Sequence, residues 1–385
     1  MATIVELLAG LVVELFRELQ QWWLGRARLR GAMAVEQPEA ERSAPSAPPP
    51  AVEPIVAELL VRHARRHIGV AVGMIRGEGT WVMGSGKARS AGPPSPPDAH
   101  TIFEIGSVTK VFTATLLAAM VEDGLVALDD PVQRYLPPGV ELPVRGRPIT
   151  LADLASHTAG LPRLPHGFIL RSMRHRRNPY SWLTVDDLHA GLPSTRLRRE
   201  PGGPPRYSNL GYGLLGHVLA VRAGRGYEQL VQERICRPLE LEDTHVAVPA
   251  AARERCAQGH SRRGRPVPRW DLPVLAGAGA LRSTVADLLR FLRLQLGEGE
   301  PTLGRAAALT HAPRARHRRG LAVGLGWTRL PLLGTEHELL FHNGGTGGFR
   351  SFAGFVPATR SAVVVLSNSA RSVDALGFRI LERIV

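Results

Sequence analysis

The sequence predicts an α+β fold in which one antiparallel sheet is built from both ends of the chain. Strand-like segments occur at 68–83 and again between 321 and 367. Between them, from about 129 to 302, the pattern is mainly helical and rich in loops. Because strands flank the helices, we expect the first and last strands to join in one sheet, with the helical part as an inserted subdomain and helices at both ends.

The first 54 residues form a separate region. In residues 1–30 the apolar side chains fall on one helical face, and most charged and amide side chains fall on the other. Two interpretations fit: an interfacial membrane helix, which we favour, or a helix docked on a protein. Glu6 and Glu14 interrupt the apolar core that a cleavable signal peptide needs. The compartment is therefore open between cytoplasm, membrane periphery and periplasm. Residues 31–54, rich in Pro and Ala, are predicted to be a linker.

Residues 55–385 are predicted to form the main domain. The apolar periodicity and the positions of Gly and Pro indicate its elements. We expect helices at 56–67, 107–123, 150–156, 184–190, 209–223, 226–236, 284–297 and 372–385. We expect strands at 68–75, 80–83, 321–329, 338–342, 349–356 and 362–367, the first two forming a hairpin.

The composition argues against several classes of protein. The formal net charge is +14, but the arginine clusters are short and scattered, and aromatic residues make up only 5%. No nucleic-acid-binding module surrounds these clusters, so we expect no nucleic-acid partner. The two cysteines, Cys236 and Cys256, show no zinc-site spacing. The sequence therefore predicts neither a metal site nor a cofactor.

Ser107 and Lys110 are the first catalytic candidates. They stand at the start of a predicted helix, where positions three apart lie on one face, so the hydroxyl and the amine can meet. The chain has two lysines, Lys87 and Lys110, against 46 arginines. A desolvated lysine can lose its proton and act as a base, whereas arginine stays protonated. The pair therefore suggests a serine nucleophile and its base. The alternative is a helix-capping serine beside a surface lysine.

Tyr207 and Asn209 form the second candidate group, on a loop just before a predicted helix. A tyrosine near a lysine ammonium can have a lowered pKa and can transfer protons. Asn209 offers a donor and an acceptor to a substrate amide or to the lysine. The alternative is a turn with an Asn helix cap and a packed tyrosine.

The third candidate is the segment FHNGGTGGF at 341–349, which follows a predicted strand. Glycines leave backbone N–H groups bare and let a ligand approach closely. One such N–H, paired with that of Ser107, would form an oxyanion hole. The alternative is a glycine-rich hairpin without a catalytic role.

Together these groups resemble the serine β-lactamase and penicillin-binding protein superfamily, in its class C β-lactamase-like branch. The order Ser-x-x-Lys, Tyr-x-Asn and a third box on a strand is similar to the family pattern. The segments FEIGSVTK, LDDPVQRYLP, ITLADLASHTAGLP, RYSNLGYGLLG, AGALRSTVADLLRFL and HNGGTGGFRS also resemble it, and the resemblance covers about 55–385. It implies a β-lactamase/transpeptidase-like fold.

The resemblance also implies roles for the candidates. Ser107 would be the acylated nucleophile, Lys110 its base, and Tyr207 the group that protonates the leaving group and later activates water. Asn209 would bind the substrate amide and steady Lys110. The N–H groups of Ser107 and Gly345 would form the oxyanion hole.

The third box departs from the family pattern. His342-Asn343-Gly344 stands where β-lactamases usually have Lys-Thr-Gly. Histidine is largely neutral near pH 7, so it lacks the permanent charge that binds a β-lactam carboxylate. We therefore predict a hydrolase of small-molecule or peptide esters or amides, with His342, Asn343, Gly344 and Gly345 in the substrate site.

Two other functions are compatible with the sequence. One is a penicillin-binding D-alanyl peptidase or a β-lactamase with the same machinery. The other is a non-catalytic, membrane-associated binding protein of the same fold, with peripheral membrane contact through residues 1–30.

Overall fold

The structure, a computed structural model, describes residues 52–385 apart from 65, 90–94, 318–320 and 333–334. The predicted helix at 1–30 and nearly all of the linker at 31–54 lie outside the described residues. Within the described part, no helix is long and apolar enough to cross a bilayer.

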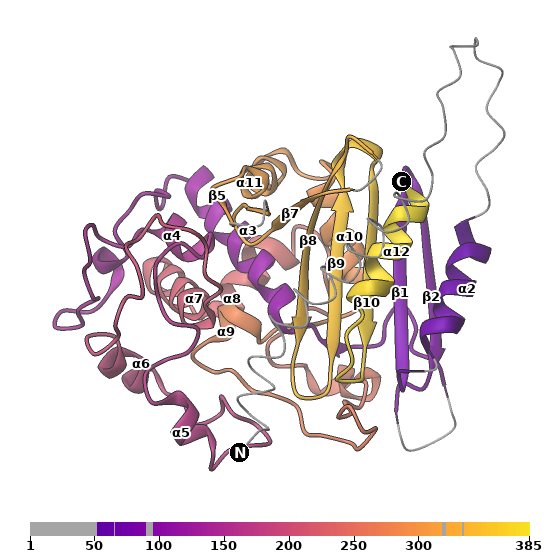
Figure 1. The fold of residues 1–385 in the computed structure, drawn as a ribbon, viewed down its shortest axis with the longest axis horizontal. Helices are drawn as coiled ribbons and strands as arrows, with labels where there is room; N and C mark the ends of the chain where they lie inside the picture. The colour runs from indigo at the N-terminus through magenta and orange to yellow at the C-terminus, as the bar shows by residue number, and fades with distance from the viewer. Residues whose placement is uncertain (1–51, 65, 90–94, 318–320, 333–334) are drawn as a thin grey trace, which may run out of the picture.

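The main sheet is antiparallel and joins the two ends of the described chain (Figure 1). The antiparallel pairing of β1 with β10, in which Val70 lies opposite Ser367, confirms that the first and last strands join in one sheet. The strands, in spatial order, are β2 (Gly79–Gly86), β1 (Gly69–Arg76), β10 (Ser361–Ser367), β9 (Arg350–Val356), β8 (Glu338–Gly345), β7 (Thr328–Pro331), β6 (Ala322–Val323) and β5 (Ala315–Arg316).

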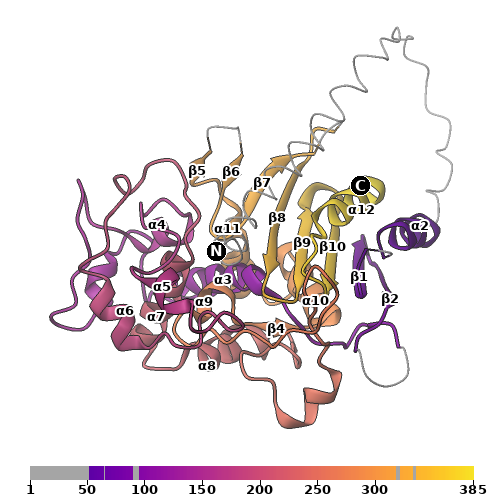
Figure 2. The ribbon, with the colours of Figure 1, turned by 60° about the horizontal axis from the view of Figure 1, so that its bottom comes forward.

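Helices cover both faces of the sheet (Figures 1 and 2). Helices α2 and α12 pack on one face, and α10 with the helical subdomain packs on the other. The helices are α2 (Val52–Ala64), α3 (Thr109–Glu122), α4 (Leu151–Ala155), α5 (Phe168–Ser172), α6 (Val185–Gly191), α7 (Asn209–Ala223), α8 (Tyr227–Val231), α9 (Ala276–Gly279), α10 (Val285–Gln295), α11 (Pro301–His311) and α12 (Asp374–Ile384).

The alternation of side chains in β8 decides which residues face the helical subdomain. Leu339 and Phe341 belong to the core under α2 and α12, whereas Leu340 belongs to the core shared with the helical subdomain. Because side chains alternate along a strand, His342 and Gly344 also lie on the inner face, toward the helical subdomain.

The strand predictions are partly wrong. The hairpin across residues 76–79 is confirmed, and Arg76 pairs with Gly79. The predicted strand at 321–329 is instead two short strands, β6 and β7, separated by a turn with Gly326 at φ +79°. β8 continues to Gly345, past the predicted end at 342, because Gly344 and Gly345 pair with Ser351 and Arg350 of β9. The glycine segment thus begins as strand and not as loop.

The helix predictions hold best where caps are clear. The helix at 209–223 is confirmed residue for residue, because the Ser208 side chain caps its start and Gly224, in the left-handed region, ends it. The segment at 226–236 is α8 followed by a π-helical turn, η3 (Gln232–Cys236). The short helices α5 and α9 were not predicted. The helical part also continues through α11 beyond the predicted limit at 302.

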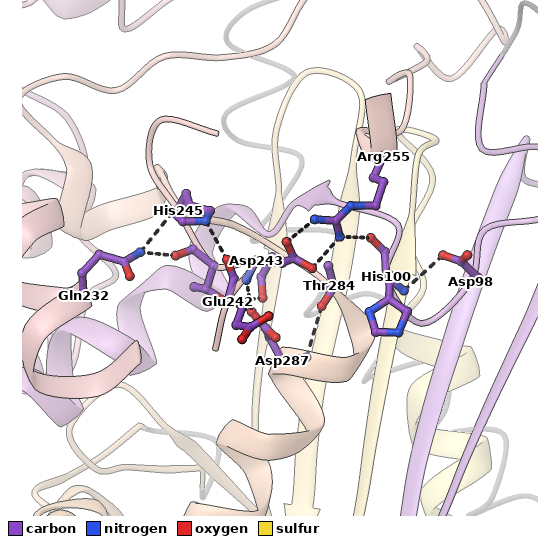
Figure 3. Close-up of polar contacts among 11 residues, drawn as sticks. Asp98, His100, Gln232, Glu242, Asp243, His245, Arg255, Thr284 and Asp287 are labelled. Carbon is purple, nitrogen blue, oxygen red and sulfur yellow. Dashed lines mark hydrogen bonds and ion pairs between the residues drawn. The ribbon is translucent and has the colours of Figure 1, made fainter. Parts of the chain in front are cut away.

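A two-stranded sheet, β3 (Phe103–Glu104) with β4 (Arg282–Ser283), leads into the predicted nucleophile. A polar network contacts the chain next to this small sheet. Figure 3 shows Asp243 between Arg255 and Asp287: its carboxylate pairs with Arg255, and its N–H donates to Asp287 Oδ2 at 2.9 Å. Arg255 Nη1 also donates to the carbonyl oxygen of His100 at 3.1 Å. The network therefore fixes the chain just before β3.

Candidate active site

Ser107 lies at the junction between β3 and the central helix. It belongs to a 3₁₀ turn, η1 (Gly106–Val108), that continues directly into α3. The helix start has no side-chain cap, so the alternative role of Ser107 as a helix cap does not apply. Lys110 follows one turn later and is completely buried. The alternative of a surface lysine is therefore wrong.

The structure brings the three predicted acid–base residues together. The Tyr207 hydroxyl donates to Ser107 Oγ at 2.6 Å, and Lys110 Nζ lies 3.0 Å from the same oxygen. α7 begins two residues after Tyr207, and α3 carries Lys110, so two packed helices hold the contact. A serine hydroxyl between an amine and a phenol is the arrangement that an activated nucleophile needs.

The surroundings of Lys110 favour its neutral form. Besides Ser107 Oγ, Lys110 Nζ contacts two atoms that can only accept, Asn209 Oδ1 at 3.0 Å and the carbonyl oxygen of Ala278 at 2.6 Å. Burial, together with the positive charge of Arg163, lowers the pKa of Lys110 well below its usual range. A neutral amine donates to both acceptors and directs its lone pair at Ser107, whose hydroxyl then donates to it. Lys110 is thus placed to act as a general base.

Tyr207 differs from the expectation. We expected the lysine to lower its pKa, but burial raises the pKa of Tyr207 to about 12, although Arg163 and the contact with Ser107 act in the opposite direction. The expectation failed because burial, which favours the neutral phenol, outweighs the opposing effects. Tyr207 therefore remains a phenol at neutral pH, which suits a proton donor.

The two candidate oxyanion-hole groups lie side by side because glycines allow it. A Cβ on Gly106, which has φ +50°, would lie 2.5 Å from Gly345 N. A Cβ on Gly344 would lie 2.1 Å from Ile105 O and 2.9 Å from Ser107 N. The turn η1 and strand β8 therefore approach more closely than any side chain would permit. Ser107 N and Gly345 N therefore belong to two backbone segments in close contact, as a shared oxyanion hole requires.

His342 faces the site as a neutral group. Its ring centre lies 6.3 Å from that of Tyr207, and its Nδ1 donates to the carbonyl oxygen of Asn343 at 2.6 Å. Burial, and then the proximity of Lys110, lower the pKa of His342 to about 3. β8 therefore presents no cation at the position where β-lactamases usually have lysine.

The Asn343 side chain lies apart from the other predicted site residues. Its Nδ2 donates to Asp374 Oδ2 at 2.8 Å, at the start of α12. α12 packs on the face of the sheet opposite the helical subdomain, so the prediction that this side chain binds substrate needs correction. The error follows from strand alternation, which turns Asn343 away from the face that carries His342.

Several residues around the site were missed by the sequence analysis. Asn209 Nδ2 donates to the Tyr180 hydroxyl at 3.2 Å, and the His157 ring lies 4.6 Å from the Tyr207 ring. The guanidinium carbon of Arg163 lies 5.0 Å from the centre of the Tyr207 ring. His157 belongs to the family-like segment SHTAGLP, and Arg163 directly follows it. That segment was the signal in the sequence that could have identified them. Ala278 in α9 begins the family-like segment AGALRSTVADLLRFL, but its side chain gives no sign of a role, because it contacts Lys110 through its backbone carbonyl.

Comparisons with known proteins show the family of the chain. Residues 34–382 match the family model described as Beta-lactamase. The chain is 30% identical over 342 residues to "D-alanyl-D-alanine-carboxypeptidase/endopeptidase AmpH" of Escherichia coli K12, covering 83% of this chain and 86% of that protein. Among solved structures, it is similar to D-alanine carboxypeptidase AmpC from Burkholderia cenocepacia, with TM-score 0.73, 27% identity, and coverage of 86% of this chain and 97% of the other.

The structure of a class C beta-lactamase from Rhodobacter sphaeroides is similar to the same degree, with TM-score 0.73, 28% identity, and coverage of 86% and 97%. Among the described residues, no group of three or more His, Cys, Asp or Glu side chains could hold a metal ion. The fold, the matched family model and the relatives agree: the chain belongs to the beta-lactamase family and is a serine hydrolase of the class C β-lactamase-like branch.

Proposed function

We propose that Ser107 is the nucleophile of this hydrolase and forms an acyl-enzyme with an ester or amide substrate. One observation carries the proposal: Ser107 Oγ lies between Lys110 Nζ at 3.0 Å and the Tyr207 hydroxyl at 2.6 Å. A serine that merely caps or packs needs neither a buried amine nor a phenol as partner.

In acylation, Lys110 takes the proton of Ser107 as Oγ attacks the substrate carbonyl carbon. The negative charge that develops on the carbonyl oxygen is stabilised by the N–H groups of Ser107 and Gly345. Tyr207 gives its proton to the leaving oxygen or nitrogen. The proton that Lys110 has taken then restores Tyr207, whose hydroxyl contacts the same Ser107 oxygen as Lys110 Nζ. In deacylation, water attacks the acyl-enzyme ester on Ser107. The proton transfers run in reverse: Tyr207 accepts a proton from the water, and Ser107 Oγ recovers its proton.

Two features describe the substrate. Asn209 is held by Lys110 and Tyr180, so its amide is oriented for a substrate amide or ester at the mouth of the site. The neutral His342 argues against β-lactam recognition through β8. We therefore rank ester or amide hydrolysis first.

A second candidate is D-alanyl peptide hydrolysis with the same machinery. It is favoured by the relative named as a D-alanyl-D-alanine-carboxypeptidase/endopeptidase, which is similar over most of both chains.

A comparison of three substrate classes tests these proposals. An activated acyl ester, an acyl-D-alanyl-D-alanine peptide and a chromogenic cephalosporin would be turned over side by side, with Ser107→Ala as the control. We expect turnover of the ester, loss of that turnover in Ser107→Ala, and slow or no turnover of the cephalosporin. Ester turnover that persists in Ser107→Ala would contradict the proposed nucleophile. Rapid cephalosporin turnover would instead identify a β-lactamase.

A further inference from the structure

The guanidinium of Arg163 lies against the catalytic tyrosine. Its backbone is fixed, because the carbonyl oxygen of Arg163 accepts the N–H groups of Asn209 at 2.9 Å and Leu210 at 3.1 Å, at the start of α7. The side chain then places Cζ 5.0 Å from the centre of the Tyr207 ring, while Lys110 Nζ lies 4.8 Å from the same centre. Arg163 therefore borders the acid–base group without belonging to it.

Within the described part of the chain, no residue accepts a hydrogen bond from the side chain of Arg163. Nε is buried without a hydrogen-bond partner, although the residue as a whole is partly exposed. Among the described residues, no carboxylate pairs with this guanidinium. By contrast, Arg147 pairs with Asp153, and Arg282 pairs with Asp271. The guanidinium has a cation–π contact with the Tyr207 ring, but a buried N–H donor without an acceptor is unfavourable. A planar guanidinium is also the side chain best suited to hold a carboxylate through two parallel hydrogen bonds.

The other basic groups of the site are less suited to bind an anionic group of the substrate. His342 is held neutral by burial, and Lys110 has a lowered pKa and already contacts three oxygen atoms. Arg163 therefore supplies a permanent positive charge against the face of the Tyr207 ring. Positive charge in this site is concentrated on the side of the proton donor and not on strand β8.

We propose that Arg163 forms an anion subsite beside Tyr207 that binds a carboxylate on the leaving group of the substrate. The proposal rests on the hydrolase function above and narrows its substrates to esters and amides whose leaving alcohol or amine carries a carboxylate. Peptides that end in a free amino acid are one such class. The subsite would supply the charge that β8 lacks.

The path of the leaving group explains why an anion subsite would lie beside Tyr207. As the Ser107 Oγ–carbon bond forms, the bond from the carbonyl carbon to the leaving oxygen or nitrogen breaks, and that atom receives the Tyr207 proton. The leaving atom must therefore lie next to the Tyr207 hydroxyl. A carboxylate attached close to that atom lies on the same side of the site as Arg163.

Two matched substrates test this subsite. Phenylacetyl esters of m-hydroxybenzoate and of m-hydroxybenzamide have the same acyl group and leaving groups of similar shape, which differ in charge. For the wild-type chain we expect kcat/KM to favour the carboxylate ester by about 10- to 100-fold, because one charge-assisted interaction is gained. Arg163→Gln should bring this ratio close to one, mainly through KM, and Arg163→Lys should retain part of it. Arg206→Gln, which removes an exposed cation beside Tyr207, should leave the ratio unchanged.

The controls separate failure of the subsite from failure of the function. A wild-type ratio near one would overturn the subsite while hydrolysis stands. Equal loss of both substrates in Arg163→Gln would also overturn it, because Arg163 would then act by positioning Tyr207. The labelling rate with an uncharged fluorophosphonate measures the effect of the Arg163 variants on the nucleophile itself, since loss of the Arg163 charge also lets the pKa of Lys110 rise. Such an effect acts on both esters alike and cancels in their ratio. Hydrolysis that survives in Ser107→Ala would contradict the proposed function itself, whatever the ratio.

Discussion

Substitution of Gly344 tests the oxyanion hole directly, because atoms of Ile105 and Ser351 leave no room for a side chain at this position. In Gly344→Ala the new Cβ would lie 2.1 Å from Ile105 O and 2.3 Å from Ser351 Oγ, whereas an ordinary contact needs at least 3.4 Å. Strand β8 or turn η1 must therefore move by more than about 1 Å. That movement separates the N–H groups of Ser107 and Gly345. Loss of one such donor lowers kcat by about 100- to 1000-fold, or about 2.7–4 kcal/mol of transition-state stabilisation.

The assay is the rate of acylation by an activated acyl ester, followed by stopped flow, together with the Tm of each variant. Gly304→Ala is the matched control, because a Cβ at this position in α11 meets no atom within 4 Å, so we expect unchanged acylation. Overpacking in Gly344→Ala should also lower stability by about 1–3 kcal/mol. If a folded Gly344→Ala acylates within a few-fold of wild type, the assignment of the oxyanion hole to this contact is wrong.

Further predictions concern the acid–base group and the N-terminal region. Tyr207→Phe should lower kcat by about 100- to 10,000-fold with a smaller change in KM, because the proton donor is lost; a change below tenfold in steady-state turnover would contradict its role. Because catalysis needs the free amine of Lys110, kcat/KM should rise with pH through a pKa well below the usual lysine value of 10.5; a profile that rises only near pH 10 would exclude this base. His342 binds a proton less readily in the folded than in the unfolded chain, so its contribution to stability should be lost as pH falls from about 6.5 toward 3; Tm measured across this range should fall less steeply in His342→Asn. Deletion of residues 1–35 should leave hydrolysis intact and abolish binding to anionic liposomes, and unchanged liposome binding would rule out a membrane anchor there.

Most of the acid–base group could be predicted from the sequence, because each of its residues lies in a recognisable local pattern. Ser107 and Lys110 are three residues apart on a helix, and the scarcity of lysine marked position 110. Tyr207 and Asn209 directly precede or begin a helix with clear caps, so their placement was also accessible. What joined these segments in one site was the family pattern and not periodicity, since Lys110 and Asn209 are 99 positions apart.

The remaining features depend on tertiary contacts that leave no local pattern. The carbonyl oxygen of Ala278 binds Lys110 through the backbone, which any residue type could provide. The orientation of Asn343 depends on how far β8 extends, and the glycines concealed that extension. The raised pKa of Tyr207 depends on burial, which the sequence around it does not specify. Arg163 follows a family-like segment, but only its contact with the Tyr207 ring and its unpartnered Nε distinguish it from the other 45 arginines.

The most direct test of the central claim is the mass of the intact protein after reaction with an activated acyl ester and rapid acid quench. We expect one added acyl group per chain, located by peptide mapping on Ser107, and no added mass in Ser107→Ala. Acylation at another residue, or an equal mass increase in Ser107→Ala, would contradict it.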